Sequence, residues 1–203
     1  MFNSSFSFKS ISIIFILTIL IPCLFIPFFY NTNSNSAINI PNLDSPIEIS
    51  PLGFAWPTPG FTTITSKFGY RISPTGQPGN FHYGLDIGAP TGTTLVAICD
   101  GEIVSVGWTG SGGYAIILAS GNLRISYCHA SPNFYVHSGD TVTRGQILGM
   151  VGPKYVYDIP NNPYKDSTGN PTNGDMTGPH LHLTVRENGK IIDPLSLFGE
   201  LSE

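Results

Sequence analysis

Charged side chains are scarce in this chain of 203 residues, and that scarcity excludes one large class of proteins. Only 11% of the residues are Asp, Glu, Lys or Arg, and the formal net charge at pH 7 is −4. The nine Lys and Arg residues are scattered along the chain. The chain therefore lacks the basic patch through which proteins bind nucleic acid, and we expect no nucleic-acid partner.

Cysteine is also scarce. Cys23, Cys99 and Cys128 are widely spaced, and no CxxC pair occurs. This pattern excludes a disulfide framework and a cysteine-based zinc site. Cys23 lies in an apolar run, so Cys99 and Cys128 are left either as one pair or as two buried free thiols. The sequence leaves both arrangements open.

A sustained helical period is missing from the region after residue 60. Instead, 23 glycines and 17 prolines are spread among short runs of β-branched and aromatic residues. This mixture is typical of strands joined by tight turns. The dipeptides Asp100-Gly101, Gly121-Asn122 and Asn188-Gly189 stand between such runs and predict β-hairpins. We expect an all-β domain over residues 60–198, folded as an antiparallel β-sandwich or barrel.

The N-terminal segment contains the long apolar run Ile11–Tyr30, which has no charged residue. A membrane-spanning helix needs about 20 apolar residues, whereas the apolar core of a signal peptide has about 7–15. Length thus favours a membrane anchor within residues 1–30. Pro22 and Pro27 would kink or shorten such a helix, so an anchor and a cleaved signal sequence both remain open.

The distribution of basic residues around this run predicts its orientation. Lys9 precedes the run, and no Lys or Arg follows until Lys67. The positive-inside rule then places the rest of the chain on the extracytoplasmic side, either tethered to the cell membrane or secreted. Residues 31–59 are rich in Asn, Ser and Pro, and we expect them to form an extended linker.

Two of the five histidines alternate in the stretch "TGPHLHLTV", residues 177–185. Residues i and i+2 of a strand point to the same face. His180 and His182 therefore share one face, while Leu181 and Leu183 belong to an apolar face on the other side. Paired imidazoles on one face suit a metal site or a catalytic site. The alternative is two surface histidines on an ordinary half-buried strand.

His82 and Asp86 could complete a metal site, because they follow one another in an H-x-x-x-D spacing within a segment rich in glycine. A catalytic zinc site typically has three protein ligands and one open position. His82, Asp86 and one histidine of the 180/182 pair would meet that requirement. No H-E-x-x-H motif supplies a glutamate base, so histidines would handle the protons.

The remaining histidines are less informative taken singly. His129 lies near the end of the run "LRISYCHA", and strict alternation places it on the face of Tyr127, with Cys128 pointing the opposite way. A partly buried structural histidine is the simpler explanation for His129 alone. His137 matches no motif, and we expect it in a surface loop. Core packing explains Tyr83 and Tyr127 as well as a functional role does.

Taken together, four segments resemble the lysostaphin-type (LytM-type) zinc metallopeptidases. In chain order they are "HYGLDIGAPTGTTLVAICDGEIVSVG", "YCHAS", "SGDTVTRGQILGMVG" and "TGPHLHLTV", and the likeness spans residues 56–194. The resemblance implies a compact antiparallel β fold with a long narrow cleft. It implies one zinc ion bound by His82, Asp86 and His182, and it implies catalytic roles for His129 and His180.

The activity implied by the resemblance is zinc-assisted hydrolysis of peptide bonds in the stem peptides or cross-bridges of bacterial peptidoglycan. Which of His129 and His180 acts as the base stays open, as does the oligomeric state. A non-catalytic binding or scaffold protein of the cell surface, built on the same fold, is the alternative, and the intact ligand positions argue against it. A biotinyl or lipoyl carrier domain would need a lysine at a hairpin tip, and the sequence has none there.

Two features depart from the family pattern. Cys128 stands where many relatives have glycine, and we expect its side chain to point away from His129. Residues 153–176 form an insertion of about 24 residues, and loops of that length are more often functional than structural. We expect the insertion to lie beside the metal and to offer its three tyrosines, Tyr155, Tyr157 and Tyr164, to a peptide substrate.

Overall fold

The computed structural model describes residues 45–71 and 81–199. The expected N-terminal helix (residues 1–30) and the first part of the expected linker lie outside these ranges. No helix of the described residues is long and apolar enough to cross a membrane. Their helical structure is limited to two 3-10 turns, η1 (Gly110–Gly112) and η2 (Pro194–Leu197). The predicted all-β class is confirmed for this part of the chain.

The strands are short, as the frequent glycines and prolines predict. In chain order they are β1 (Ile64–Ser66), β2 (Gly69–Tyr70), β3 (Phe81–His82), β4 (Leu85–Gly88), β5 (Thr94–Val96), β6 (Gly101–Trp108), β7 (Tyr114–Ser120), β8 (Leu123–Cys128), β9 (Thr141–Val142), β10 (Ile147–Met150), β11 (His180–Glu187) and β12 (Lys190–Ile192).

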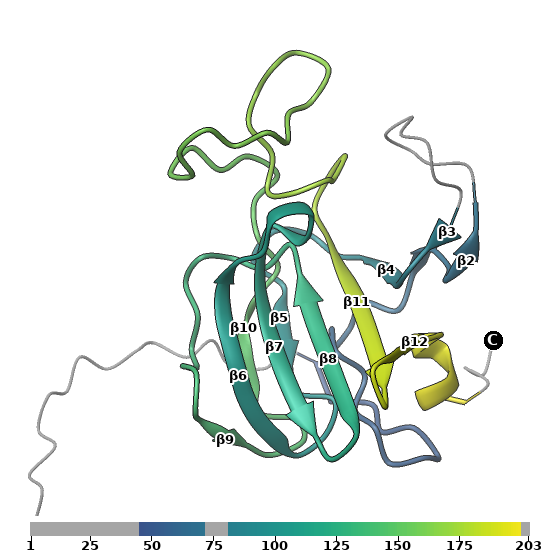
Figure 1. Ribbon diagram of the computed structural model, residues 1–203. Helices are drawn as coiled ribbons and strands as arrows, with labels where there is room; N and C mark the ends of the chain where they lie inside the picture. Colours follow the sequence, from purple (N-terminus) through teal and green to yellow (C-terminus); the bar gives the residue numbers. More distant parts are fainter. Residues whose placement is uncertain (1–44, 72–80, 200–203) are drawn as a thin grey trace, which may run out of the picture. The chain divides into compact units, whose positions relative to one another are not determined.

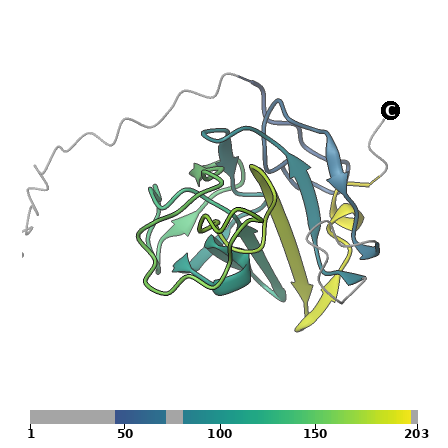
Figure 2. The same cartoon turned by 90° about the horizontal axis from the view of Figure 1, so that it is seen from above.

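The largest sheet has the strand order β1-β4-β11-β8-β7-β6-β9, and β12 pairs with the far end of β11. β5 pairs with β10 and β2 pairs with β3 in two small sheets, and every pairing is antiparallel. β11 thus lies between β4 and β8 (Figure 1). Seen from above, β6–β8 and the long β10–β11 connection lie on one side of β11, while β1 and β4 lie on the other (Figure 2).

The apolar face of β11 confirms the predicted alternation. Leu181, Leu183 and Val185 are fully buried in the core, beside Ile125 and Tyr127 of β8. Burying an aliphatic side chain of this size contributes about 1.5–3 kcal/mol. This face therefore holds β11 against the core, and the register sends the intervening side chains, including His180 and His182, to the opposite face.

Two of the three predicted hairpins are present. Ser120 pairs with Leu123 across the two-residue Gly121-Asn122 turn that joins β7 to β8. Asn188 and Gly189 both have positive φ, at 49° and 78°, and they join β11 to β12. Positive φ at both central residues is the type I′ geometry that Asn-Gly favours, whereas in the Gly121-Asn122 turn only Gly121 has positive φ (54°).

The third predicted hairpin, at Asp100-Gly101, is wrong. β5 pairs with β10, whereas β6 pairs with β7 and β9. Asp100 accepts a hydrogen bond from the backbone N–H of Arg144 (2.6 Å), which ties this segment to a distant part of the chain. A Cβ at Gly101 would lie 2.2 Å from the Ala119 carbonyl oxygen, so glycine is needed here for close strand approach rather than for a turn.

The expected linker, residues 31–59, needs correction for the part that the structure describes. Ala55 and Trp56 are buried, and the Trp56 ring packs edge-on against Phe198 with 5.0 Å between the ring centroids. The Trp56 indole N–H donates to the Phe61 carbonyl oxygen at 2.7 Å. Packing of one large aromatic residue therefore draws residues 45–59 onto the domain, which begins before residue 60.

Candidate metal centre

His82, Asp86 and His182 converge at one point of the large sheet. One nitrogen or oxygen atom from each lies within 4.8 Å of the others, and no other such group of His, Cys, Asp or Glu occurs among the described residues. Asp86 on β4 pairs directly with His182 on β11. His82 on β3 reaches the same point from the neighbouring two-stranded sheet, with its Nε2 atom 3.2 Å from Asp86 Oδ1.

The hydrogen bonds around these imidazoles leave lone pairs directed at their common centre. His82 Nδ1 lies 2.9 Å from the Lys67 carbonyl oxygen, which can only accept, so this nitrogen carries the proton and Nε2 is bare. His182 Nε2 lies 3.0 Å from the Thr184 hydroxyl, to which it can donate, and in that tautomer His182 Nδ1 is bare and can bind a metal ion. Histidines that bind metal ions typically donate their other N–H group in this way.

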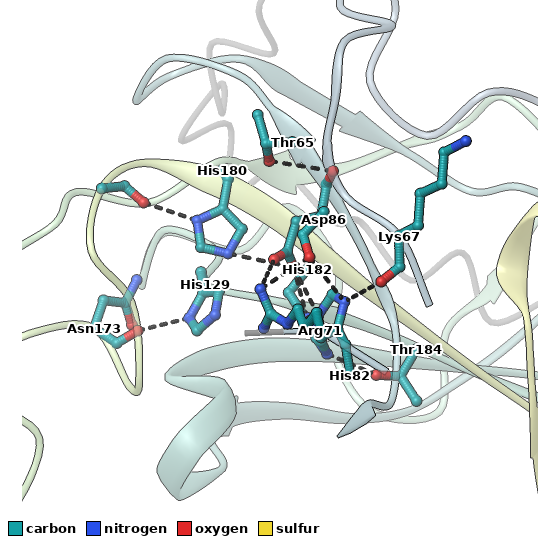
Figure 3. A network of polar contacts seen from close by, with 12 residues as sticks. Thr65, Lys67, Arg71, His82, Asp86, His129, Asn173, His180, His182 and Thr184 are labelled. Carbon is teal, nitrogen blue, oxygen red and sulfur yellow. Dashed lines mark hydrogen bonds and ion pairs between the residues drawn. The ribbon is translucent and has the colours of Figure 1, made fainter. Parts of the chain in front are cut away.

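The bare nitrogens and the carboxylate form a site that fits a divalent cation. His82 Nε2 and His182 Nδ1 lie 3.0 Å apart, and His182 Nδ1 lies 2.8 Å from Asp86 Oδ1 (Figure 3). In the tautomer with both nitrogens bare, a divalent cation between the three atoms would relieve the repulsion of their lone pairs. Two imidazoles and one carboxylate are a ligand set that zinc accepts.

The charge state of Asp86 suits the same role. Burial opposes ionisation, but the contacts with His182 and His82 outweigh it and hold the pKa of the carboxyl well below its usual range. Arg71 lies 3.5 Å from the second carboxylate oxygen, Oδ2, and donates to the Ser66 hydroxyl at 2.9 Å. The carboxylate is therefore ionised and oriented, with Oδ1 turned toward the two histidines.

His129 and His180 stand beside this group and close to one another. The His129 and His180 ring centroids are 4.7 Å apart, and His180 Nε2 lies 3.6 Å from Asp86 Oδ1. His180 Nδ1 donates to the Gly178 carbonyl oxygen at 2.8 Å. His129 Nδ1 donates to the Asn173 carbonyl oxygen at 2.7 Å (Figure 3). Since both acceptors are carbonyls, each imidazole is the Nδ1–H tautomer when neutral, with a bare Nε2.

The position of His129 differs from the strict strand alternation that the sequence predicts. β8 ends at Cys128, and His129 has φ of 59°, in the left-handed region that non-glycine residues rarely adopt. This turn breaks the alternation and brings His129 into the same cleft as His180 rather than onto the core face of Tyr127. Strained backbone of this kind is commonest at functional sites.

The orientation predicted for Cys128 is wrong for the same reason. Cys128 pairs directly with His182 across β8 and β11, so its side chain lies on the His182 face and lines the cleft. Burial, with a smaller contribution from the charge of Asp86, raises the pKa of the Cys128 thiol to about 12. Cys99 and Cys128 are both free. Cys128 is thus a neutral thiol in the wall of the site.

Burial also keeps the two outer histidines neutral. It lowers the pKa of His129 to about 3, and the nearby His180 and His182 rings add to the effect. The pKa of His180 is lowered too, chiefly by burial, although the charge of Asp86 opposes the shift. Neutral imidazoles with a bare Nε2 can accept a proton at neutral pH.

All five residues line one cleft of about 1170 Å³. The insertion contributes to it only through its last residues, Asp175 and Met176. None of its three tyrosines lines the cleft, so their contact with a peptide substrate stays a prediction. Tyr155 donates to Asp166, Tyr164 packs against Trp108, and Tyr157 is 73% exposed. His137 is exposed, as expected.

Several groups around the site escape sequence reasoning. The carbonyls of Lys67, Gly178 and Asn173 act through the backbone, which has no sequence signature. Arg71 stands outside every recognised motif. Thr184 could have been found, because it lies two residues after His182 on the same strand face.

Comparison with known proteins gives this site a family context. The family model described as Peptidase family M23 matches residues 80–194. The DD-carboxypeptidase/endopeptidase Mpg of Neisseria meningitidis is 32% identical over 138 residues, which are 68% of this chain and 27% of that protein. The glycyl-glycine endopeptidase ALE-1 of Staphylococcus capitis is 36% identical over 124 residues, which are 60% of this chain and 29% of ALE-1. The chain thus spans less than a third of these relatives' length.

The solved structures agree with the sequence relatives. The catalytic domain of the antimicrobial peptidase lysostaphin from Staphylococcus simulans superposes with a TM-score of 0.52 at 31% sequence identity. That match covers 67% of this chain and 91% of the lysostaphin domain. The mostly antiparallel β fold is the lysostaphin-type fold, and the family model covers more than half of the chain. This chain belongs to peptidase family M23, a family of metallopeptidases.

Proposed function

We propose that the chain is a zinc-dependent endopeptidase that hydrolyses peptide bonds in peptidoglycan stem peptides or cross-bridges. One observation carries the proposal. A ligand group of His82, Asp86 and His182 lies in the same cleft as two neutral histidines whose Nε2 atoms are free to exchange protons. A protein that only binds the cell wall has no need for this second pair of histidines.

His82, Asp86 and His182 would hold the zinc ion. When bound there, zinc supplies a Lewis acid that lowers the pKa of water to about 7 and polarises the scissile carbonyl. His180 Nε2 is bare and lies 3.6 Å from Asp86 Oδ1, so it stands beside the ligand group and can accept a proton from the attacking water. Once His180 holds that proton, it can donate a hydrogen bond to the developing oxyanion. His129 stands beside His180, and its bare Nε2 can likewise orient or deprotonate the water, because both rings have the same tautomer.

The substrate class rests on the relatives. Mpg is a DD-carboxypeptidase/endopeptidase and ALE-1 is a glycyl-glycine endopeptidase. Similarity to proteins with these activities supports a peptide of the bacterial cell wall as the substrate. The large open cleft accommodates an extended peptide.

Digestion of purified peptidoglycan by the full-length chain tests the proposal. Mass spectrometry should identify new peptide termini in the zinc-loaded sample and none after treatment with a chelator, with activity restored by added zinc. Binding to peptidoglycan without new termini at any zinc concentration would instead establish the non-catalytic binding or scaffold protein.

The cellular location is proposed from the sequence alone. We propose that residues 1–30 carry the domain to the extracytoplasmic side, where its substrate lies. Protease added to intact cells without an outer barrier should remove the domain, and protection from protease would contradict this location. A mature N-terminus near Ala37 would indicate a cleaved signal rather than an anchor.

A further inference from the structure

Asn173 is a fully buried polar residue near the end of the insertion, and none of the predicted site residues lies next to it in the sequence. Two glycines, Gly113 and Gly152, lie against its side chain. A Cβ at Gly113 would lie 2.3 Å from Asn173 Oδ1, and a Cβ at Gly152 would lie 2.6 Å from its Nδ2. The fold therefore reserves a closely fitting space for this one amide side chain.

Both ends of the Asn173 amide are used within that space. Oδ1 accepts the backbone N–H of Tyr114 at 2.8 Å, and Nδ2 donates to the Ala130 carbonyl oxygen at 2.9 Å. The Asn173 backbone N–H donates to the Lys154 carbonyl oxygen at 2.9 Å. Asn173 thus ties the insertion to β7 and to the residue that directly follows His129.

The one remaining polar group of Asn173, its carbonyl oxygen, accepts the proton of His129 Nδ1. Three other bonds fix this oxygen in space, so the direction of the His129 N–H is fixed with it. A proton held on Nδ1 keeps Nε2 bare. If the carbonyl moved away, the imidazole would be free to rotate and to exchange its proton between the two nitrogens.

We propose that Asn173 is the positioning residue of the reaction: its buried amide anchors the backbone carbonyl that orients His129 and fixes it as the Nδ1–H tautomer. This inference rests on the proposed peptidase function for its effect on rate. Its effect on the tautomer does not depend on activity. The insertion thereby acts on the site through Asn173, near its C-terminal end, and this role does not depend on what its exposed residues contact.

Asn173→Ala removes both anchoring bonds and leaves the residues of the ligand group in place. We expect kcat for a peptide released from peptidoglycan to fall by about 10–100-fold, by analogy with the loss of groups that orient the histidines of metal sites. KM should change by less than about threefold, and zinc content should stay at the wild-type level. In ¹⁵N-labelled, zinc-loaded, full-length protein, NMR should find His129 as Nδ1–H in the wild type and as a mixture of tautomers in the variant.

Asn162→Ala is the matched control. Asn162 is also a buried asparagine of the insertion, and its amide bonds the Thr172 carbonyl oxygen and the Tyr164 N–H without touching a histidine. This variant should keep the wild-type His129 tautomer and a kcat within about threefold of the parent, as expected for a group outside the site.

A second change covers the case in which Asn173→Ala fails to fold. Replacing Gly174 by glycolic acid turns the Asn173 carbonyl into an ester, a weaker acceptor, while the amide side chain remains. It should reproduce the tautomer mixture. A wild-type His129 protonated on Nε2, or a His129 unchanged in both the alanine and the ester variants, would overturn the proposal. A chain that cuts no peptidoglycan but shows the expected tautomers would refute the peptidase function alone.

Discussion

The two sets of site residues are held by different kinds of structure. The ligand group of His82, Asp86 and His182 stands on paired strands, and the pairing of Asp86 with His182 is fixed by the sheet. His129 follows the last residue of β8 and His180 begins β11, and their rings are held by carbonyls of residues 173 and 178.

Because the ligands and the outer histidines are held differently, we expect metal binding and proton transfer to respond to different substitutions. Strand register is fixed by an apolar face, and a shift of one residue would expose Leu181 and Leu183. Carbonyls in a loop depend on local anchors such as Asn173. We therefore expect metal binding to tolerate changes in the loop and turnover to respond to them.

The ligand group should show the largest effect. His82→Ala, Asp86→Ala and His182→Ala each remove one of three protein ligands, and we expect zinc content to fall from about one ion per chain to near zero, together with all activity. Elemental analysis after dialysis measures the zinc, and peptidoglycan digestion measures the activity. Full zinc retention in any of the three variants would remove that residue from the ligand set.

His129→Ala and His180→Ala should keep their zinc and lose most turnover. Loss of a residue that transfers a proton costs about 10²–10⁴-fold in kcat, and neither side chain belongs to the ligand group. The same zinc assay and steady-state kinetics apply. If the His180 variant lost zinc while the His182 variant retained it, the roles within the H-x-H pair would be reversed.

Gly84→Ala should weaken metal binding without removing a ligand. An added Cβ would lie 2.6 Å from His182 Cε1 and Nε2 and 2.7 Å from the Leu183 carbonyl oxygen, so the ring and the adjoining backbone of β11 must shift. Displacing an oriented ligand costs about 10–100-fold in metal affinity, which competition with a chelator measures. At Gly178 an added Cβ meets nothing within 4 Å, so Gly178→Ala should bind zinc like the parent. Equal zinc affinity in the two variants would contradict this account.

The pH dependence of stability should show the smallest effect. Burial lowers the pKa of His129 to about 3 in the folded state, against about 6.5 when unfolded. Between these values the unfolded chain binds more protons, so this contribution is complete above pH 6.5 and is lost as pH falls toward 3. Urea unfolding in the presence of chelator should show His129→Gln losing less stability than the parent from pH 7 to pH 5, by on the order of 1–2 kcal/mol. If the free energy of unfolding changed equally with pH in the variant and the parent, the low pKa of His129 would be contradicted.

Sequence patterns of short range gave correct predictions. Alternation alone separated the His180 and His182 face from the Leu181 and Leu183 face. The turn dipeptides at residues 121–122 and 188–189 lie in hairpins because their backbone preferences are local. The resemblance to a known family named five residues, and the structure brings them into one cleft. For the alternation and the two hairpins, the physical cause acts within a few residues of the chain.

Predictions were wrong where the structure of a segment depends on residues far away in the chain. Asp100-Gly101 has the same local preference as the true hairpins, but close approach of β6 to Ala119 and the bond from Arg144 decide its structure. Trp56 looked like part of a linker because its partner, Phe198, lies at the other end of the domain.

Periodicity along the chain was enough to predict the all-β class and the face of β11 that carries histidines. The choice of His182 rather than His180 as a ligand came from the resemblance to a known family. Only the tertiary structure decided the direction of His129, the exposure of Cys128 to the cleft and the role of Asn173. The reason is that a backbone carbonyl has no side-chain signature. Its position is fixed by bonds to residues far away in the chain, as Asn173 is fixed by Tyr114 and Ala130.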